Sequence, residues 1–535
     1  MADPNVYKAM TLKDTTDLIA RVHKAAANPI AIAPHYDGTA GEYDNLEEWW
    51  SLNRDGKVYG VKIPTWDYSN DPKGIKTRDN VGLVIEPSTE TVAGRDDYAT
   101  LNAFKVVFCN ATVDDDGVPH VTAIEGDGRF KRDGSNGDVW SMVCNGYYSI
   151  TVANGYKEIL WSDSPQEGFK TMTGGAYPDG TRRPYLLFAC YVACLDSGNV
   201  PHSWSGHMPD MQFGSHDRQV AYAKLKGAGY SGRTVQDNFY VQMMLMLKYA
   251  TQNSDGIGGC SDYNLTYTVA AAEASVNRVQ VTTAQAANFV VGSAISIGTS
   301  TDRGQDACHA VADRRKVTKI EAVSSDVTAI YFDGDPVTVS TGDYVVTMPW
   351  PSGSCDNILG NDGYPVSGKA VNRQPYRIQG IECFVGLYES LADVICQQVK
   401  DSDDAGRIEL YKTFNAKNYG SAINSNTVKL DMELPARDAS NNNAWHYAED
   451  WRESTVCPGF LVPQGTGATS TTGTCDAVYS SPITSAGLRM LQCFGYLSAS
   501  GFSGAFCAHS GSALSGLYWG IGGRLSALGV TKPGA

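Results

Sequence analysis

The sequence has few basic residues and no long apolar run. Its 535 residues include 43 Lys and Arg against 58 Asp and Glu, a net charge of −15, and no basic stripe that would bind a nucleic-acid backbone. No stretch reaches the roughly 18–20 apolar residues of a membrane span, and residues 1–29 lack the apolar region of a signal peptide. We therefore expect no nucleic-acid partner, no membrane insertion, and synthesis in a cytoplasm without a signal peptide.

Metal-site spacing is missing as well. None of the 13 cysteines forms a CxxC pair or a Cys/His quartet with the spacing of zinc ligands. Cys190 and Cys194 lie in an apolar stretch typical of a strand, where thiols pack as small hydrophobic groups. His202, His207 and Asp210 share a loop without the helical spacing of a metal site. We expect neither a metal nor a cofactor.

The sequence also has no pattern typical of catalysis. The densest carboxylate cluster, in residues 113–120, fits a hairpin turn better than the paired acids of a glycosidase. Residues 520–524, GIGGR, do not follow the Gly-x-Gly-x-x-Gly dinucleotide pattern. No serine stands in a Gly-x-Ser-x-Gly elbow beside a matched histidine and acid. We expect a protein that is not an enzyme.

What is present indicates a β-rich globular chain with 42% hydrophobic residues, 55 Gly and 29 Tyr. After an expected helix over residues 11–27, short alternating runs with Asp-Gly and Asn-Gly corners predict β-hairpins from about 55 to 215. Within residues 216–253, an apolar, Met-rich run after Thr234 and Asp237 predicts a capped helix packed in a core.

Residues 263–349 contain Val/Ile/Thr-rich strands separated by turns, which predict a small β-barrel or sandwich with its own core. Cys260 and Cys355 stand at the two edges of this insert. Because the ends of an insert lie near each other, the two thiols are candidates for a bridge, and two unrelated free thiols are the simpler interpretation.

Residues 491–529 differ from the rest of the chain. From Cys493 to Gly523 they include no Asp, Glu, Lys, Arg, Gln or Met, whereas 19% of the whole chain is charged. Aromatic residues on a bed of Gly, Ser and Ala resemble an antibody binding site in composition, because aromatic side chains give large contact areas with few torsions to freeze. A buried, glycine-rich strand pair is the alternative interpretation.

Three stretches resemble one known family. They are Gly504-Ala505-Phe506 followed by Ile521-Gly522-Gly523-Arg524-Leu525, the stretch from Tyr376 to Ile395, and the helix expected before Ile257. Together they resemble the variable proteins of diversity-generating retroelements, phage tail or surface receptor-binding proteins with a C-type lectin fold of the formylglycine-generating-enzyme subtype. Two departures are Cys493–Leu497, where the family commonly has Gly-Gly-x-Trp, and Gln379, where it prefers Arg.

The residue patterns and the resemblance, which does not extend to the insert, together predict an α+β fold with a defined order of regions. An N-terminal helix (1–27) and a β-rich assembly region (28–215) precede a C-terminal C-type lectin-like domain (216–262 and 350–535). The small β-barrel or sandwich insert (263–349) interrupts that domain, and residues 491–529 are its variable ligand-binding segment.

In this family, template adenines are copied as random bases, and a randomised Asn codon cannot yield Lys, Glu, Gln, Met or Trp. The composition from Cys493 to Gly520 agrees, with Trp519 taken as fixed. The resemblance therefore makes the following residues candidate ligand contacts: Tyr496, Ser498, Ala499, Phe502, Cys507, His509, Ser510, Gly511, Leu514, Gly516, Leu517, Tyr518 and Gly520. Phe506, Trp519, Ile521 and Arg524 are expected to form the scaffold beneath them.

The function implied is attachment of a phage tail to a host-cell surface receptor, either protein or glycan. The expected location is the virion tail, exposed to the extracellular medium, with other tail proteins as partners and a homo-oligomer, commonly a trimer, as the assembly. The alternatives are a glycan-cleaving tail fibre (a depolymerase), a purely structural tail protein, and a copper-dependent oxidase of the formylglycine-generating type. The oxidase would need a paired-cysteine site, for which Cys493 and Cys507 are the nearest thiols.

Overall fold

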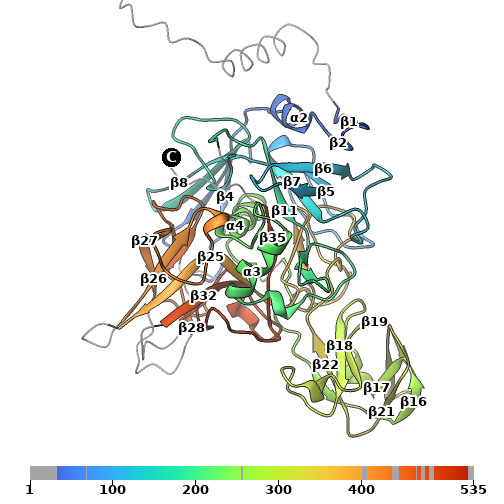
Figure 1. Ribbon diagram of the computed structural model, residues 1–535. Coiled ribbons are helices and arrows are strands. Elements are labelled where there is room, and N and C mark those ends of the chain that lie inside the picture. Colours follow the sequence, from blue (N-terminus) through green and yellow to red (C-terminus); the bar gives the residue numbers. More distant parts are fainter. Residues whose placement is uncertain are drawn as a thin grey trace, which may run out of the picture.

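The computed structural model describes residues 33–67, 69–177, 179–254, 257–400, 406–435, 445–465, 467–471, 476–480 and 487–527. The structure is mostly β-sheet with few helices, 38% strand and 12% helix, which fits a β-rich α+β class. The long helix α4 (Val235–Tyr249) lies at the centre, and the sheets surround it (Figure 1). The helix predicted over residues 11–27 lies outside the described residues.

Two antiparallel sheets contain most strands of the N-terminal half. The six-stranded sheet has the order β14 (Ser231–Gly232), β35 (Leu525–Ser526), β11 (Tyr185–Ala189), β7 (Val139–Cys144), β5 (Val106–Val113) and β6 (Pro119–Ile124). The five-stranded sheet has the order β10 (Lys170–Thr171), β8 (Tyr147–Ala153), β9 (Tyr156–Ser162), β3 (Tyr59–Pro64) and β4 (Ile75–Arg78). Strands β7 and β11 are buried along their whole length, which explains their nearly unbroken apolar sequences.

Two of the predicted Asp-Gly and Asn-Gly corners form β-hairpins, and a third does not. Residues 114–118 join β5 to β6, and Asn154-Gly155, both at positive φ, join β8 to β9. The hairpin expected at Asn145-Gly146 is wrong, because β7 and β8 lie in different sheets. The Asn145 amide instead donates to two backbone carbonyl oxygens and holds the crossover between the sheets.

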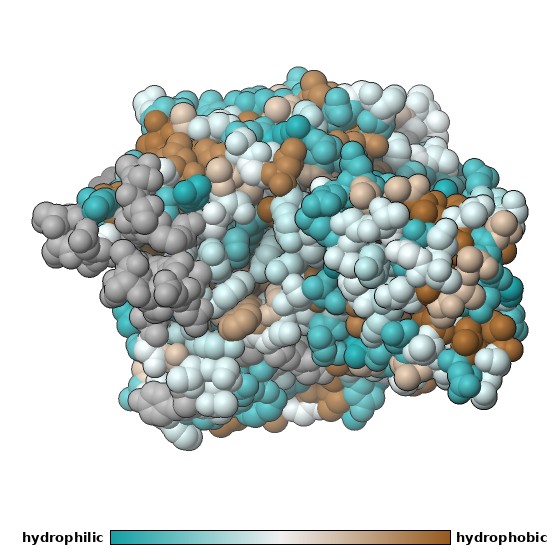
Figure 2. All heavy atoms as spheres, turned by 90° about the horizontal axis from the view of Figure 1, so that it is seen from below, coloured by the Kyte–Doolittle hydropathy of each residue, from teal (hydrophilic) through white to brown (hydrophobic). Residues whose placement is uncertain are grey.

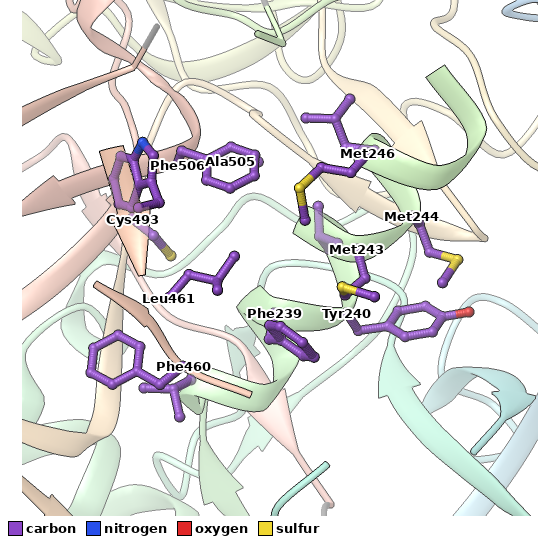
Figure 3. Packing of buried hydrophobic residues seen from close by; sticks show 14 of the residues in the cluster. Phe239, Tyr240, Met243, Met244, Met246, Phe460, Leu461, Cys493, Ala505 and Phe506 are labelled. Carbon is purple, nitrogen blue, oxygen red and sulfur yellow. The ribbon is translucent and has the colours of Figure 1, made fainter. Parts of the chain in front are cut away.

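Helix α4 begins as the sequence predicts and is buried in the main hydrophobic core. The Thr234 side chain accepts from the backbone of Asp237, and the Asp237 carboxylate accepts from the backbone of Thr234, which forms a capping box. The helix ends at Ala250, in the left-handed region at φ 54°. The methionines of α4 belong to the same hydrophobic cluster as Phe460, Leu461 and Phe506 (Figure 3).

The C-terminal half is built on an eight-stranded sheet. Its order is β27 (Thr427–Leu434), β26 (Arg407–Thr413), β25 (Tyr388–Val399), β32 (Gly487–Phe494), β33 (Gly504–His509), β31 (Ala477–Tyr479) and β28 (Trp445–Tyr447), and β34 (Ile521–Gly522) also pairs with β25. The β31–β33 and β25–β34 pairs are parallel, and the other pairs are antiparallel.

The predicted insert forms a second six-stranded sheet, which projects at the lower right of Figure 1. Its order is β15 (Thr266–Thr268), β22 (Tyr344–Met348), β18 (Ala294–Gly298), β19 (Ala312–Ala322), β20 (Val327–Phe332) and β17 (Arg278–Thr282). The pair β16 (Glu273–Val276) and β21 (Val337–Val339) and helix α5 (Thr283–Ala286) complete it. Its apolar side chains, including Val279, Phe289 and Ile330, form a hydrophobic cluster separate from the main core.

Strands on the two sides of residue 215 pack together. Strand β35, near the C-terminus, pairs with β11 and so joins the N-terminal six-stranded sheet. The main core likewise combines side chains of β3 and β9 with those of α4, β25 and β33. The division into an assembly region and a lectin-like domain thus stays a prediction about organisation, and packing is continuous across it.

The remaining elements are short. They are α2 (Leu46–Leu52), α3 (His216–Lys226), and the strand pairs β1 (Tyr36–Asp37) with β2 (Glu42–Tyr43), β12 (Cys194–Leu195) with β13 (Pro201–His202), β23 (Tyr376–Ile378) with β24 (Ile381–Cys383), and β29 (Asp450–Glu453) with β30 (Leu461–Gln464). Ser215 caps the start of α3 through its side chain.

Candidate ligand-binding surface

The segment of residues 491–529 runs along one part of the eight-stranded sheet and then crosses to the N-terminal six-stranded sheet. Strands β32 and β33 are antiparallel, and a 3-10 turn at Ser500–Phe502 lies between them. The chain continues through residues 510–520 to β34 and then to β35. Residues 528 and 529 of the predicted variable segment lie outside the described residues. Both sheets therefore fix the segment along its length.

Eight of the thirteen predicted contact residues reach the surface. Leu517 is 40% exposed and Tyr518 is 46% exposed, and Ser498 is exposed as well. The half-buried candidates are Tyr496, Phe502, His509, Gly511 and Gly516.

The structure places the other five inside the protein, so they are not part of its exposed surface. They are Ala499, Cys507, Ser510, Leu514 and Gly520. Leu514, for example, packs against Ile395 and Met490. The backbone N–H and the hydroxyl of Ser510 both donate to the carbonyl oxygen of Tyr479. The sheet and its flanking loop need these residues for packing.

Aromatic rings from the segment and from neighbouring strands form one continuous array. We call this set the aromatic array: Tyr388, Trp445, Tyr447, Tyr479, Tyr496, Phe502, His509, Tyr518 and Trp519. Neighbouring ring centroids are between 4.4 and 6.2 Å apart, the range in which aromatic pairs attract one another. Seven of the nine rings are half-buried or exposed, so the array presents ring surface to solvent.

Four of these rings lie outside the segment that the sequence singled out. Tyr388 comes from β25, Trp445 and Tyr447 from β28, and Tyr479 from β31. The sequence predicted none of the four as a ligand contact. Because β33 pairs with β31 and β31 with β28, pairing brings these rings to the segment. For β28 and β31, the signal in the sequence that could have indicated this was an aromatic residue in a short strand between polar loops.

Hydropathy is a poor guide to an aromatic surface. Seen from below, the molecule shows mainly pale and teal residues with smaller brown patches (Figure 2). Tyrosine and tryptophan have intermediate hydropathy, so an aromatic surface looks pale in such a view. Ring geometry is the better guide to this surface.

His509 lies in the middle of the array and carries no charge at neutral pH. Its ring stacks on Tyr479 with centroids 4.4 Å apart, and its Nδ1 lies 2.8 Å from Oε1 of Gln492. Burial lowers the pKa of His509 to about 4. The imidazole is therefore neutral at pH 7, and the array has no ionised side chain there.

The four residues predicted as scaffold are all buried: Phe506, Trp519, Ile521 and Arg524. The backbone N–H of Phe506 donates to Oδ2 of Asp476 at 2.8 Å. At Gly504, an added Cβ would lie 2.0 Å from the same Oδ2, so only glycine allows this approach. Packing and hydrogen bonds together hold β33 beneath the exposed rings.

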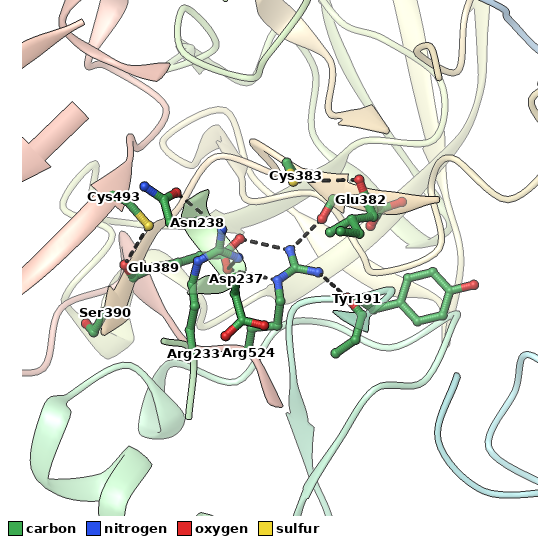
Figure 4. Close-up of polar contacts among 12 residues, drawn as sticks. Tyr191, Arg233, Asp237, Asn238, Glu382, Cys383, Glu389, Ser390, Cys493 and Arg524 are labelled. Atoms are coloured by element: carbon green, nitrogen blue, oxygen red, sulfur yellow. Dashed lines mark hydrogen bonds and ion pairs between the residues drawn. The ribbon is translucent and has the colours of Figure 1, made fainter. Parts of the chain in front are cut away.

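A buried ion cluster fixes the end of the segment to β25 (Figure 4). Nε and Nη2 of Arg524 donate to the two carboxylate oxygens of Glu389, both at 2.9 Å, and Nη1 of Arg233 donates to Oε2 at 2.9 Å. All three side chains are at most 1% exposed. Burial opposes ionisation of Glu389, but the two guanidinium groups outweigh it and lower the pKa of the carboxyl.

The insert is anchored directly beside the array. The Arg303 guanidinium lies 5.4 Å from the centre of the Trp519 ring, and its nitrogens donate to the carbonyl oxygens of Thr347 and Leu265. The backbone N–H of Tyr263 donates to the carbonyl oxygen of Leu497 at 2.8 Å. The base of the insert therefore supports the Trp519 end of the array.

The thiols and histidines considered for other chemistry have structural surroundings. All twelve described cysteines are free and buried, so Cys260 and Cys355 form no bridge. Burial raises the pKa of Cys493 to about 12, and the thiol donates to the backbone carbonyl oxygen of Glu389. His202 stacks on Trp204 with centroids 3.7 Å apart. Within the described ranges, no three His, Cys, Asp or Glu side chains are grouped to hold a metal ion.

Comparisons with known proteins give no assignment. No protein-family model matches the chain, and no curated protein matches its sequence. In the described part of the chain, no helix is both long and apolar enough to cross a membrane. Any functional assignment must therefore be argued from the surface itself.

Proposed function

We propose that this chain attaches a phage tail to a host-cell surface receptor, with the aromatic array as its contact surface. In this proposal the chain is a variable protein of a diversity-generating retroelement. Its α4 core and eight-stranded sheet then correspond to a C-type lectin fold, and residues 491–529 to the variable segment. The proposed assembly is a homo-oligomer on the virion tail, in contact with other tail proteins.

The observation that carries this proposal is a half-exposed aromatic array on rigid supports. The rings come from four strands and two loops, and Trp519, which is one of them, is buried. Each tyrosine adds large apolar contact area with few torsions to freeze, and aromatic side chains supply many of the strong contacts in interfaces. Because His509 is neutral, binding does not require the desolvation of a charged side chain at the centre of the array.

The small residues around the rings fit the same role. Ser498, Gly511 and Gly516 are exposed or half-buried, and Gly511 lies against the rings of Tyr479 and His509. Short side chains let a partner approach the ring faces closely, as in antibody binding sites. No contact among the described residues specifically favours the depolymerase or the oxidase alternative, since the carboxylate cluster at 114–116 lies in a hairpin turn and Cys493 is a buried thiol.

The experiment is adsorption of labelled, purified full-length protein to cells of the bacterium that the phage infects. Replacing Leu517 and Tyr518 together by Ser should lower adsorption at least tenfold, because loss of a central aromatic contact costs about 2 kcal/mol or more. Trp66→Ser removes an aromatic side chain that is 59% exposed elsewhere and should leave adsorption unchanged. Equal adsorption of the double variant and the unchanged protein would refute the proposal.

A further inference from the structure

Two buried polar groups beneath the aromatic array have no hydrogen-bond partner among the described residues. They are the Tyr388 hydroxyl and Nε2 of Gln492. Tyr388 is 4% exposed and Gln492 is fully buried. Buried polar groups in native proteins are nearly always paired, and an unpaired one destabilises the fold, so each exception calls for an explanation.

Both residues contact the same member of the array, His509. The Tyr388 ring packs between Tyr496, at 5.3 Å, and His509, at 4.8 Å between centroids. Nδ1 of His509, in the tautomer that carries the proton there, donates to Oε1 of Gln492 at 2.8 Å, which leaves Nε2 of Gln492 unpaired. Tyr388 lies on β25 and Gln492 on the neighbouring β32, where Gln492 pairs with Ser390. Neither residue is among the candidate contacts predicted from the sequence.

We propose that Tyr388 and Gln492 form a fixed polar floor that binds a carbonyl oxygen of the partner, and that the partner is an apolar polypeptide segment. An amide nitrogen can only donate, and a phenol hydroxyl donates readily, so the complementary group is an acceptor. A carbonyl oxygen has two lone pairs and can accept from both. This inference rests on the proposed attachment function and assigns a partner class to it.

Access to the floor runs past Tyr496. This side chain is half-buried, and its ring packs on Tyr388. In this proposal, rotation of the Tyr496 side chain opens the way to the Tyr388 hydroxyl, because Tyr496 packs directly on the Tyr388 ring. Tyr496 then covers the polar floor. Tyr388 and Gln492, which form the floor, are not among the candidate variable residues.

The chemistry of the surrounding surface favours a polypeptide over a glycan. From Cys493 to Gly520 the chain has no Asp, Glu, Asn, Gln, Lys or Arg. A sugar ring displays several hydroxyl groups that would need hydrogen-bond partners, and burying them unpaired is unfavourable. A polypeptide with apolar side chains and a free backbone carbonyl needs few polar contacts and matches both the ring faces and the floor.

The test uses two small probes that share an acetamido carbonyl and differ in what carries it. N-acetylphenylalaninamide and N-acetylglucosamine are titrated into the full-length protein, and binding is followed by ligand-detected NMR. We expect N-acetylphenylalaninamide to bind with a saturable signal and N-acetylglucosamine not to bind. If neither binds, or if N-acetylglucosamine binds and depends on Tyr388, the proposal of a polypeptide partner is wrong.

The decisive variant is Tyr388→Phe, which removes only the unpaired hydroxyl. It should weaken N-acetylphenylalaninamide binding at least fivefold while the melting temperature stays the same or rises. Tyr240→Phe is the matched control: its hydroxyl accepts from Nε2 of Gln379 at 3.2 Å, so this change should lower the melting temperature and leave binding unchanged. Equal binding by Tyr388→Phe and the unchanged protein would overturn the inference. The attachment proposal fails separately, if the Leu517 and Tyr518 double variant adsorbs normally.

Discussion

Tyr518 and Trp519 are adjacent in the chain and have opposite surroundings. Tyr518 is 46% exposed, whereas Trp519 is 6% exposed and packs with Leu497 and Trp350 in a hydrophobic cluster. We expect Tyr518→Ser to change the free energy of unfolding by about 0.5 kcal/mol or less. Trp519→Ser should lower it by about 3–5 kcal/mol, because it removes a large buried ring. Urea unfolding of both variants measures this, and equal losses would mean that Tyr518 belongs to the core.

Phe502 is intermediate between Tyr518 and Trp519 in burial, which the sequence did not predict. It is half-buried, and its ring stacks on Trp445 with centroids 4.8 Å apart and 10° between the ring planes. Such a pair adds about 0.5–1.5 kcal/mol beyond the burial of its area. The sequence placed Phe502 with Tyr518 because the partner ring, on β28, is distant in the chain.

His509 gives a prediction about pH. Its pKa is about 4 in the folded protein and near 6.5 when unfolded, so the unfolded chain takes up the proton first as the pH falls. The contribution of His509 to stability is therefore complete above pH 6.5 and is lost progressively between pH 6.5 and 4. His509→Phe should remove this part of the pH dependence in urea unfolding. An NMR titration midpoint of His509 near 6.5 in the folded protein would contradict it.

Among the elements, strand β25 is joined to the end of the variable segment by its pairing with β34 and by one buried carboxylate. Glu389→Gln would remove the carboxylate that forms ion pairs with both Arg233 and Arg524. We expect a loss of about 3–5 kcal/mol in the free energy of unfolding, as for other broken buried ion pairs. Lys319→Gln breaks an exposed pair with Glu321 and should leave the melting temperature unchanged. A small effect of Glu389→Gln would mean that packing alone holds these strands.

Local signals in the sequence predicted some helix and strand boundaries correctly and others wrongly. The capping box at Thr234 and Asp237 predicted the start of α4 because both partners are three residues apart in the chain. The Asn145-Gly146 corner predicted a hairpin that does not form, because tertiary hydrogen bonds direct β8 into another sheet. Tyr388, Trp445 and Tyr479 could not be assigned to the array, since strand pairing rather than sequence distance brings them there.

At the scale of the whole molecule, the insert has its own hydrophobic cluster and also supports the array. Deleting residues 266–347 and joining the ends with a short Gly/Ser linker keeps Tyr263 and Trp350, which pack with Trp519. We expect a folded protein, because the free energy of loop closure changes slowly with loop length. Trp519 should become more exposed, since Arg303 is removed, and tryptophan fluorescence should report this. Loss of a cooperative melt would show that the insert is part of the core.

The central claim is that residues 491–529 present a variable, ligand-binding surface on a fixed scaffold. The most direct measurement is to sequence the coding region of this segment in many independent isolates. We expect substitutions to concentrate at the exposed Ser498, Leu517 and Tyr518, and to yield only residues open to an adenine-randomised Asn codon. Phe506, Trp519 and Arg524, which are buried, should not vary. Substitutions spread evenly along the chain, or concentrated at these buried residues, would contradict the account.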